Sequence, residues 1–230
     1  MLDQLRSIVN KTLRYAFFIC IIRPFVWLVL GLRVRDRQNL PDKGPAIICA
    51  NHNSHLDTIV LMSLLPISRL HLIHPAAKAA YWWDAGRWIR WFGEHIIGVV
   101  PAYRYRGEGS GDPLRAIYPV LEEGKILLFF PEGSRGEPEQ LRPFKRGLVT
   151  LGERFPDVPI IPVYMHGMGK SWPRGSRMIL PFICDVYIGR AITYQQSPHD
   201  LLARFGSAIE QLARQGNFPE WLPKEATSNR

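Results

Sequence analysis

Short apolar segments with a preference for β-strands alternate with helical segments along most of this chain, and no other feature narrows its fold as much. The apolar segments are PAIICAN, IIGVVPAY, KILLFFPEG, VPIIPVYMHG and MILPFICDVYIG. Helices are predicted near residues 54–65 and 113–122, and an amphipathic helix over 199–214. Such alternation is typical of α/β proteins. Because the strand segments are almost entirely apolar, we predict a mixed, largely buried β-sheet that is flanked by helices.

The segment over residues 15–32 is strongly apolar and about as long as a membrane-spanning helix, but Arg23 and Pro24 stand at its centre. An arginine at mid-bilayer costs roughly 2.5–3.5 kcal/mol, and Pro24 disfavours helix at Arg23. Each half would be only about 12 Å long as a helix, against roughly 30 Å of hydrocarbon. We therefore predict two short helices that lie in one leaflet, with a transmembrane helix and a buried core helix as alternatives.

Three parts of the chain are expected. Residues 1–38 form an N-terminal membrane-associating helical segment, residues 39–216 form the α/β domain, and residues 217–230 form a C-terminal tail. Basic residues flank the apolar segment on both sides, so the positive-inside rule gives no crossing direction. The simplest arrangement keeps both ends on the cytoplasmic side of the inner or plasma membrane.

The formal charge of +9 indicates an anionic partner, such as phospholipid headgroups, phosphorylated metabolites or nucleic acid. The basic residues are spread over the chain and no nucleic-acid-binding module is recognisable, so we expect no nucleic acid. Tryptophans and arginines crowd residues 82–92, which is typical of a surface that seeks a membrane interface, although a helix that packs its rings into the core is an equal alternative. The cysteines, at positions 20, 49 and 184, suggest neither a disulfide framework nor a thiolate metal site.

The segment IICANHNSHLDT is the most informative one for chemistry, because an apolar strand ends there at Asn51 and His52 and a helix is predicted to begin at Ser54. Helix capping by Ser54 and Asp57 would explain those two residues but not His52. From the first turn of the helix, Asp57 could reach back to the His52 imidazole and stabilise its protonated form. His52 is therefore a candidate general base, oriented by Asp57.

A metal site in the same segment would use His52, His55 and Asp57. Their pattern, H-x-x-H-x-D, lacks the paired spacing of helical zinc sites, and no other histidine has an obvious ligand partner. We therefore predict no metal site.

The segment ILLFFPEGSRG is the second candidate, since a hydrophobic strand leads directly into Glu132, Gly133, Ser134 and Arg135. Glycines free the backbone to present N–H groups, and an arginine fork matches phosphate oxygens. This turn is therefore a candidate anion site, although an ordinary polar turn would have the same composition. Lys145 is a further cationic candidate, for which a solvated side chain is the alternative.

Four blocks in this order resemble the glycerolipid acyltransferases typified by 1-acyl-glycerol-3-phosphate acyltransferase. The first is NHNSHLD, which holds His52 and Asp57, and the second is GVVPAYR, which ends at Arg104. The third is FPEGSRG, over residues 130–136, and the fourth is VPIIPV, over residues 158–163. The second block differs from the usual family pattern at Tyr103, where an acidic or amide residue commonly precedes the arginine.

The resemblance implies an enzyme that moves a fatty acyl group from acyl-CoA or acyl-carrier protein to the sn-2 hydroxyl of lysophosphatidic acid, without a further cofactor. It makes His52 the base and Asp57 its partner, in a catalytic domain over residues 39–216. It also implies that Arg104 and the turn from Glu132 to Arg135 bind the acceptor, and that Pro162 belongs to the acyl-chain block. Another acceptor of the same chemistry, or a non-catalytic lipid-binding protein, is the alternative.

Overall fold

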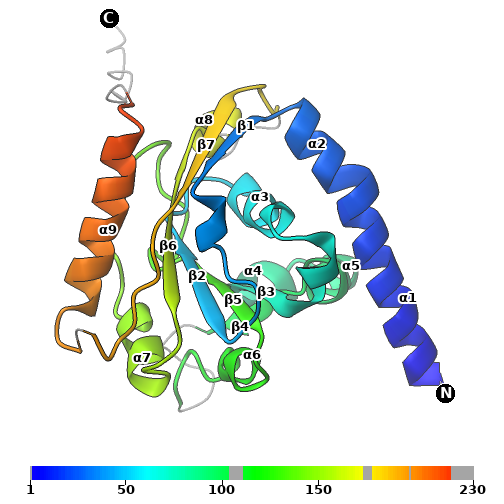
Figure 1. Cartoon of the computed structure of the whole chain (residues 1–230). Helices are drawn as coiled ribbons and strands as arrows, with labels where there is room; N and C mark the ends of the chain where they lie inside the picture. Colours follow the sequence, from blue (N-terminus) through cyan, green and yellow to red (C-terminus); the bar gives the residue numbers. More distant parts are fainter. Residues whose placement is uncertain (1, 104–110, 173–177, 197, 219–230) are drawn as a thin grey trace, which may run out of the picture.

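The computed structural model describes residues 2–103, 111–172, 178–196 and 198–218. Its centre is one seven-stranded sheet with the strand order β1-β7-β6-β2-β5-β3-β4 (Figure 1). The strands are β1 (Gly31–Arg35), β2 (Ala46–Ala50), β3 (Ile73–Lys78), β4 (Val100–Ala102), β5 (Ile126–Phe129), β6 (Ile160–His166) and β7 (Ile183–Ile188).

The sheet is mixed, as predicted. Strands β6, β2, β5, β3 and β4 run parallel to one another, whereas β7 runs antiparallel to β6 and parallel to β1. The carboxyl ends of β2, β5 and β6 therefore lie at one edge of the sheet, where ligand sites of open α/β sheets are usually found.

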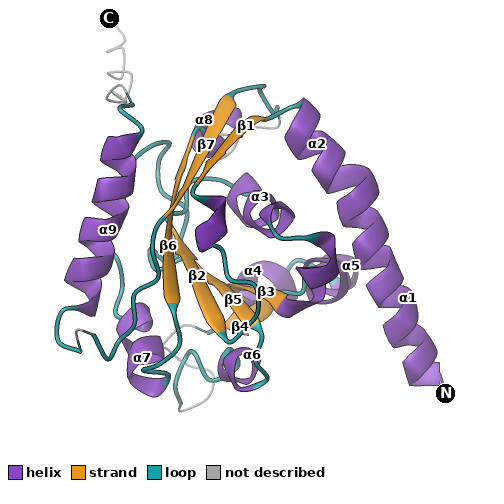
Figure 2. Cartoon of the chain, in the orientation of Figure 1, coloured by secondary structure: helices purple, strands orange, loops and turns teal. Residues whose placement is uncertain are grey.

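Helices cover both faces of the sheet, as Figure 2 shows. One face carries the N-terminal helices together with α3, α4 and α5, and the other carries α6, α7 and α9. The helices are α1 (Leu2–Phe17), α2 (Arg23–Leu28), α3 (Leu56–Leu64), α4 (Ala79–Trp83), α5 (Arg87–Phe92), α6 (Tyr118–Glu122), α7 (Gly147–Arg154), α8 (Met168–Ser171) and α9 (Leu201–Gln215). Shorter turns are π-helical at η1 (Phe18–Ile22) and η4 (Gly93–Ile97), and 3-10 at η2 (Arg37–Asn39) and η3 (Ile67–Leu72).

Strand β2 explains why the strand segments are apolar throughout. Successive side chains of a strand point to opposite faces. Ile48 and Ala50 accordingly pack into the core under the N-terminal helices, while Ile47 and Cys49 pack into the core under α6, α7 and α9. All four are fully buried.

The N-terminal helices correct the prediction of a break at Arg23 and Pro24. The chain continues from α1 through the π-helical turn η1 into α2, and the Arg23 backbone is helical. Pro24 sits in the first turn of α2, where a missing N–H is tolerated next to the wider π-helical turn. The Arg23 guanidinium donates to the carbonyl of Leu65 at 2.8 Å, so it points toward the domain.

This helical run packs one face against the domain and exposes the other. Its inward face buries side chains four residues apart: Phe18, Ile22, Val26 and Leu30. Its outward face exposes a second apolar stripe, formed by Leu5, Ile8, Val9 and Leu13. Among the described residues, no helix combines the length and the apolar character that crossing a bilayer requires.

Several predicted elements shift in the structure. Residues 93–97 are π-helical, so only Val100–Ala102 of the segment 96–103 is a strand. The helix predicted over 113–122 is confined to Tyr118–Glu122. Strands β1 and β3 were not predicted; β1 lies within the range 1–38 yet pairs with β7 in the sheet. The division of the chain into three parts stays a prediction.

Candidate active site

The site lies where β2, β5 and β6 end. His52 follows β2, Glu132 follows β5, and the Glu132 side chain accepts a hydrogen bond from the His52 backbone. Asn51 joins the ends of β2 and β6, because its side-chain amide exchanges two hydrogen bonds with the backbone of Met165, at 2.9 and 2.7 Å. The loop that carries His52 is thereby held against the end of β6.

His52 and Asp57 form the pair that the sequence predicted. The Nδ1 atom of His52 lies 2.8 Å from Oδ2 of Asp57. Asp57 is 1% exposed, whereas the His52 side chain is 18% exposed. Because Nδ1 is engaged by the carboxylate, Nε2 is the ring nitrogen left for a further partner.

Asp57 also fixes the backbone between the two residues. Its Oδ2 atom accepts from the N–H groups of Asn53 at 2.7 Å and of Ser54 at 2.8 Å, and Ser54 Oγ accepts from the N–H of Leu56 at 3.3 Å. Asp57 stands in the first turn of α3, where the helix dipole favours a negative charge. Capping and the bond to His52 are thus made by the same carboxylate.

Two neighbours hold His52 from the side of β5. Its ring stacks on Phe130, with the ring centroids 4.1 Å apart, and its backbone N–H donates to Oε1 of Glu132 at 3.0 Å. Glu132 is 1% exposed, and its Oε2 atom has no hydrogen-bond partner in the described part of the chain. Burial raises the pKa of Glu132 to about 7, and the charge of Asp57 adds to this effect. Glu132 therefore has a structural role beside His52 that the sequence did not indicate.

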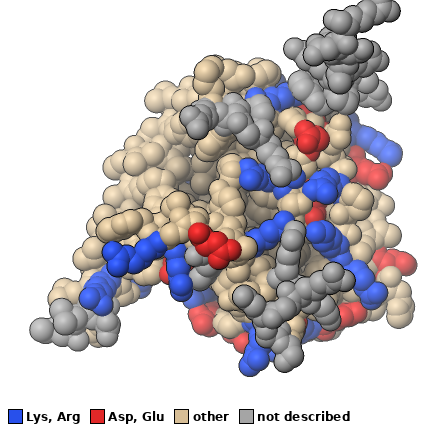
Figure 3. Space-filling model, turned by 180° about the vertical axis from the view of Figure 1, so that it is seen from behind, with Lys and Arg blue, Asp and Glu red and all other residues tan. Residues whose placement is uncertain are grey.

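The turn after Glu132 has the features of an anion site. Gly133 has a left-handed backbone with φ of 69°, and a Cβ atom there would lie 2.9 Å from Nζ of Lys145. The Lys145 ammonium therefore lies directly over the turn. Arg142, which the sequence analysis did not single out, donates to Oγ of Ser134 at 2.7 Å. Arg142 and Lys145 therefore lie against this turn, and Figure 3 shows Lys and Arg side chains gathered across the middle of one face.

His55 lies beside the anion turn as a neutral ring. Burial lowers its pKa to about 4, and the charges of Arg135 and His52 lower it further. The ring lies between Tyr81 and Trp172, at centroid distances of 5.7 and 5.4 Å. The loop therefore has two different histidines: His52 is paired with a carboxylate, and His55 is in contact with two aromatic rings.

The structure leaves the roles of two predicted binding residues untested. Arg104 lies outside the described residues, and its neighbour Tyr103 is 48% exposed. Pro162 lies inside β6, level with Cys49 of β2, and its carbonyl accepts from the N–H of Gly189 at 2.8 Å. The roles of both residues stay predictions.

A second histidine–carboxylate pair, which was not predicted from the sequence, lies at the end of β6. Nδ1 of His166 is 2.5 Å from Oε2 of Glu139, and both side chains are buried. The residues are 27 positions apart, so no local spacing could reveal them. Within the described ranges, no three His, Cys, Asp or Glu side chains gather as metal ligands.

Comparison with known proteins identifies the family. A family model described as "Acyltransferase" matches residues 31–166, more than half of the chain. A chloroplastic 1-acyl-sn-glycerol-3-phosphate acyltransferase of Brassica napus is 31% identical over 153 residues, which are 64% of this chain and 40% of that protein. The alpha form of the enzyme from Ovis aries is 27% identical over 163 residues, 69% of this chain and 53% of its own. The matched part thus spans about half the length of these relatives, or less.

The fold has a solved counterpart. The crystal structure of the 1-acyl-sn-glycerophosphate (LPA) acyltransferase PlsC of Thermotoga maritima superposes with a TM-score of 0.70 at 19% identity, and the match covers 96% of this chain and 85% of that one. At this identity the match shows a shared fold. Together with the family model over residues 31–166, it leads to one conclusion: the chain belongs to the acyltransferase family, as its four sequence blocks predicted.

Proposed function

We propose that the chain transfers a fatty acyl group from acyl-CoA or acyl-carrier protein to the sn-2 hydroxyl of 1-acyl-glycerol-3-phosphate, and so produces phosphatidic acid. The observation that carries this proposal is the His52–Asp57 pair, 2.8 Å apart, beside a turn crowded with basic side chains. A base next to an anion site is what the transfer of an acyl group to a phosphorylated alcohol requires. The names of the relatives from Brassica napus and Ovis aries favour the same acceptor.

Proton transfer is the role we assign to His52. Nε2 takes the proton of the acceptor hydroxyl while the hydroxyl oxygen attacks the thioester carbonyl, and Asp57 stabilises the imidazolium that forms. The C–S bond then breaks, and the thiolate leaves with the electron pair and takes up the proton from His52. A thiolate is a good leaving group, so the step needs no strong acid.

The acceptor phosphate is assigned to the turn from Glu132 to Arg135. Backbone N–H groups of the turn and the cations of Arg135 and Lys145 supply charge-assisted hydrogen bonds to phosphate oxygens. Arg142 adds to this set through Ser134. Arg104 of the second block is proposed to complete it, and Pro162 is proposed to belong to the acyl-chain site.

Membrane attachment is part of the proposal, because lysophosphatidic acid and its product both reside in the bilayer. The outward stripe of α1 supplies exposed apolar side chains, and a second exposed group includes Trp27 and Leu28 at the end of α2. Leu180 and Phe182, in the segment before β7, are also exposed. Helices of this kind bind at the interface of one leaflet. Attachment at the cytoplasmic face stays a prediction.

The reaction is tested with purified protein in mixed micelles and a radiolabelled acyl donor. Lysophosphatidic acid, glycerol-3-phosphate and zwitterionic lysophospholipids are offered separately, each with acyl-CoA and with acyl-carrier protein. We expect product from lysophosphatidic acid with at least one donor, and none with the His52→Ala variant. Transfer only to another acceptor would refute the proposed substrate, and no transfer at all would refute the proposed activity.

Membrane attachment is tested on the full chain, because removal of the first helices would also remove Phe18, Ile22 and Val26 and so uncover the core that they cover. Leu5, Ile8, Val9 and Leu13 are replaced together by serine, and binding to vesicles that contain anionic phospholipid is measured by flotation. We expect the variant to stay with the soluble fraction at high salt while the unaltered protein floats. Equal flotation of both proteins would contradict the role of this stripe.

A further inference from the structure

The buried pair of His166 and Glu139 ties together two loops of the site. Oε2 of Glu139 contacts Nδ1 of His166 at 2.5 Å, and Oε1 accepts from the backbone N–H of Gly167 at 2.9 Å. The Glu139 side chain is 3% exposed and that of His166 is 9% exposed. One carboxylate thus binds the loop that follows β5 to the turn that follows β6.

The same loop is bound to the His52 loop. The N–H of Gly136 donates to the His52 carbonyl at 2.9 Å. With its amide oriented to satisfy its partners, Asn53 donates to that carbonyl at 3.1 Å and accepts from the N–H of Glu139 at 3.3 Å. Glu139 is therefore in contact with both histidine loops.

Glu139 keeps an unfavourable backbone conformation in this position. Its φ is 61°, in the left-handed region that residues other than glycine rarely adopt. Such a conformation persists only where surrounding contacts determine it. Here those contacts are the ion-pair contact with His166 and the hydrogen bond from Gly167, so the side chain holds the backbone of the loop in place.

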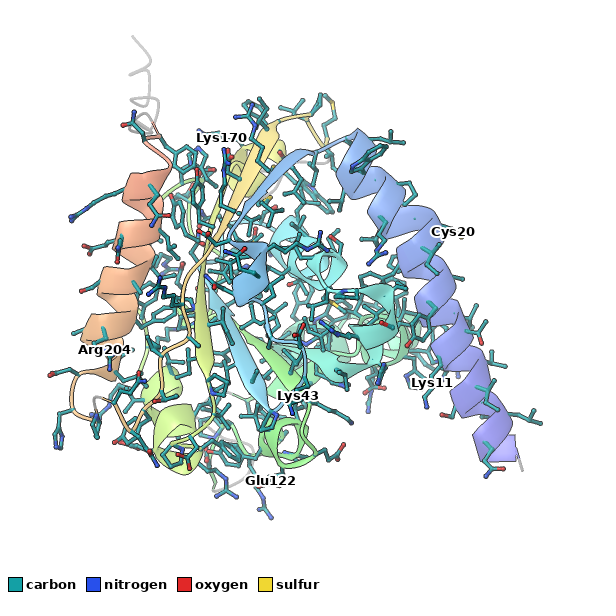
Figure 4. All side chains as sticks on the ribbon, viewed as in Figure 1. Lys11, Cys20, Lys43, Glu122, Lys170 and Arg204 are labelled. Carbon is teal, nitrogen blue, oxygen red and sulfur yellow. The ribbon has the colours of Figure 1, made fainter. Side chains whose placement is uncertain are left out.

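Packing closes the region around the pair. A Cβ atom on Gly169 would lie 2.9 Å from Cα of Pro138, so α8 sits tightly against the residue before Glu139. Phe218 stacks on the His166 ring with centroids 3.7 Å apart. Lys170, labelled in Figure 4, lies 3.5 Å from the other ring nitrogen of His166. Helix α8, Phe218 and Lys170 therefore all pack around the pair.

We infer that Glu139, held by His166, is a positioning residue that sets the anion turn at a fixed distance from His52. This inference rests on the proposed function, because it assigns the purpose of the fixed distance to acceptor binding. Removal of the carboxylate frees the loop from Gly136 to Glu139 and displaces Arg135, which precedes Gly136. Small displacements of a binding group weaken substrate binding before they affect a base on another loop.

The kinetic test compares Glu139→Ala with Glu139→Gln and with Glu137→Ala. Glutamine can still accept from Gly167 but loses the charge, whereas Glu137 is exposed two positions away and serves as the control. We expect KM for lysophosphatidic acid to rise about tenfold in the alanine variant and about threefold in the glutamine variant. The kcat, the donor KM and the Glu137→Ala variant should each stay within about twofold.

A double-mutant cycle with Arg135→Ala tests the route of the effect. If Glu139 acts by placing Arg135, Glu139→Ala should add less than about twofold to KM when Arg135 is already absent. A full tenfold increase in that background would overturn the inference. So would a lower melting temperature with an unchanged acceptor KM, because a merely structural residue would behave in that way.

A measurement without substrate separates this inference from the proposed function. Hydrogen exchange in the free protein should become faster over residues 132–140 in Glu139→Ala, and stay unchanged over α3 and in Glu137→Ala. Faster exchange with no acyl transfer by the unaltered protein would refute the proposed function but support the role of Glu139 in holding the loop. Unchanged exchange over residues 132–140 would refute this role of Glu139, whether or not the protein transfers acyl groups.

Discussion

Two histidine–carboxylate pairs lie at the same edge of one sheet and differ in surroundings. His52 and His166 follow Asn51 and Met165, which are hydrogen-bonded to each other across β2 and β6. The His52 side chain is 18% exposed and its partner Asp57 is five residues away on α3. The His166 side chain is 9% exposed, stacks on Phe218, and takes its carboxylate from a distant loop.

This difference shows how burial decides what the same two chemical groups can do. In the first pair the imidazole is partly exposed, and the proposed function has it take and return a proton. In the second pair Lys170 lies beside the second nitrogen and an aromatic ring covers the imidazole. The first arrangement suits a base, and the second suits a fixed link between loops.

Substitution of Asp57 should give the largest effect among changes that leave both histidines in place. In Asp57→Asn the amide cannot stabilise an imidazolium, so we expect kcat to fall by about 100-fold or more. Two backbone N–H groups also lose a charged acceptor, which should lower the free energy of unfolding by roughly 1–2 kcal/mol. Steady-state kinetics and urea unfolding measure the two losses.

The contrast between the pairs would be lost if Glu139→Gln lowered kcat as strongly as Asp57→Asn. That outcome would mean that both carboxylates serve proton transfer. A normal kcat in Asp57→Asn would contradict the role of His52 as a base that Asp57 supports.

Glu132 should make stability depend on pH beside the first pair. Burial raises the pKa of Glu132 to about 7, whereas a glutamate in the unfolded chain titrates near pH 4.3. The folded protein therefore retains a proton that the unfolded chain releases, and this contribution is full below about pH 4 and is lost as the pH rises to about 7. Between pH 4 and pH 8, the free energy of unfolding of Glu132→Gln should rise by on the order of 2–3 kcal/mol relative to that of the unaltered protein.

Urea unfolding at a series of pH values measures this difference. His55 and His74, whose pKa values burial lowers to about 4, act in the opposite direction in both proteins and cancel in the comparison. A difference that does not change with pH would show that Glu132 titrates normally.

Gly133→Ala should disturb the anion turn and leave both pairs intact. The backbone there has φ of 69°, and the new Cβ would lie 2.9 Å from Nζ of Lys145. We expect a loss of stability of about 1 kcal/mol and a several-fold higher KM for lysophosphatidic acid. Gly124→Ala is the matched control, because Gly124 has φ of 70° and open space around it. An equal rise in KM in both variants would contradict a local effect at Lys145.

The smallest effect is expected from uncovering the second pair. Phe218→Ala removes the ring that stacks on His166 and should raise KM for lysophosphatidic acid about twofold, with kcat unchanged. Phe218→Leu, which keeps an apolar cover, should retain the normal KM. A large fall in kcat in Phe218→Ala would show that the cover serves more than the link between loops.

The parts of the fold that sequence predicted were those whose signal is local. The apolar segments gave β2, β5, β6 and β7, and the periodic residues 199–214 gave α9. Strand β1, with the sequence GLRVR, alternates polar and apolar residues next to a segment that suggested a membrane helix, and β3 contains a proline. The pairing of β1 with β7 and of β3 with β5 decides their conformation, and the residues of either segment alone do not predict this pairing.

The candidate site was predictable to the same extent. His52 and Asp57 are five residues apart, and the turn after β5 is a continuous motif. Glu139 and His166 meet only because the loop after β5 folds over the end of β6. Arg142 reaches Ser134 across a loop whose course no spacing reveals. Contacts between loops were therefore the part that required the structure.

Under the proposed function, His52 is the base for acyl transfer and His166, at the same edge of the sheet, is not. Single-turnover rates at saturating lysophosphatidic acid and acyl donor test it most directly, with His52→Ala and His166→Gln compared against the unaltered protein. We expect the rate to fall by about 1,000-fold in His52→Ala and to stay within about tenfold in His166→Gln. Comparable losses in the two variants, or a His52→Ala variant that retains most of its rate, would contradict it.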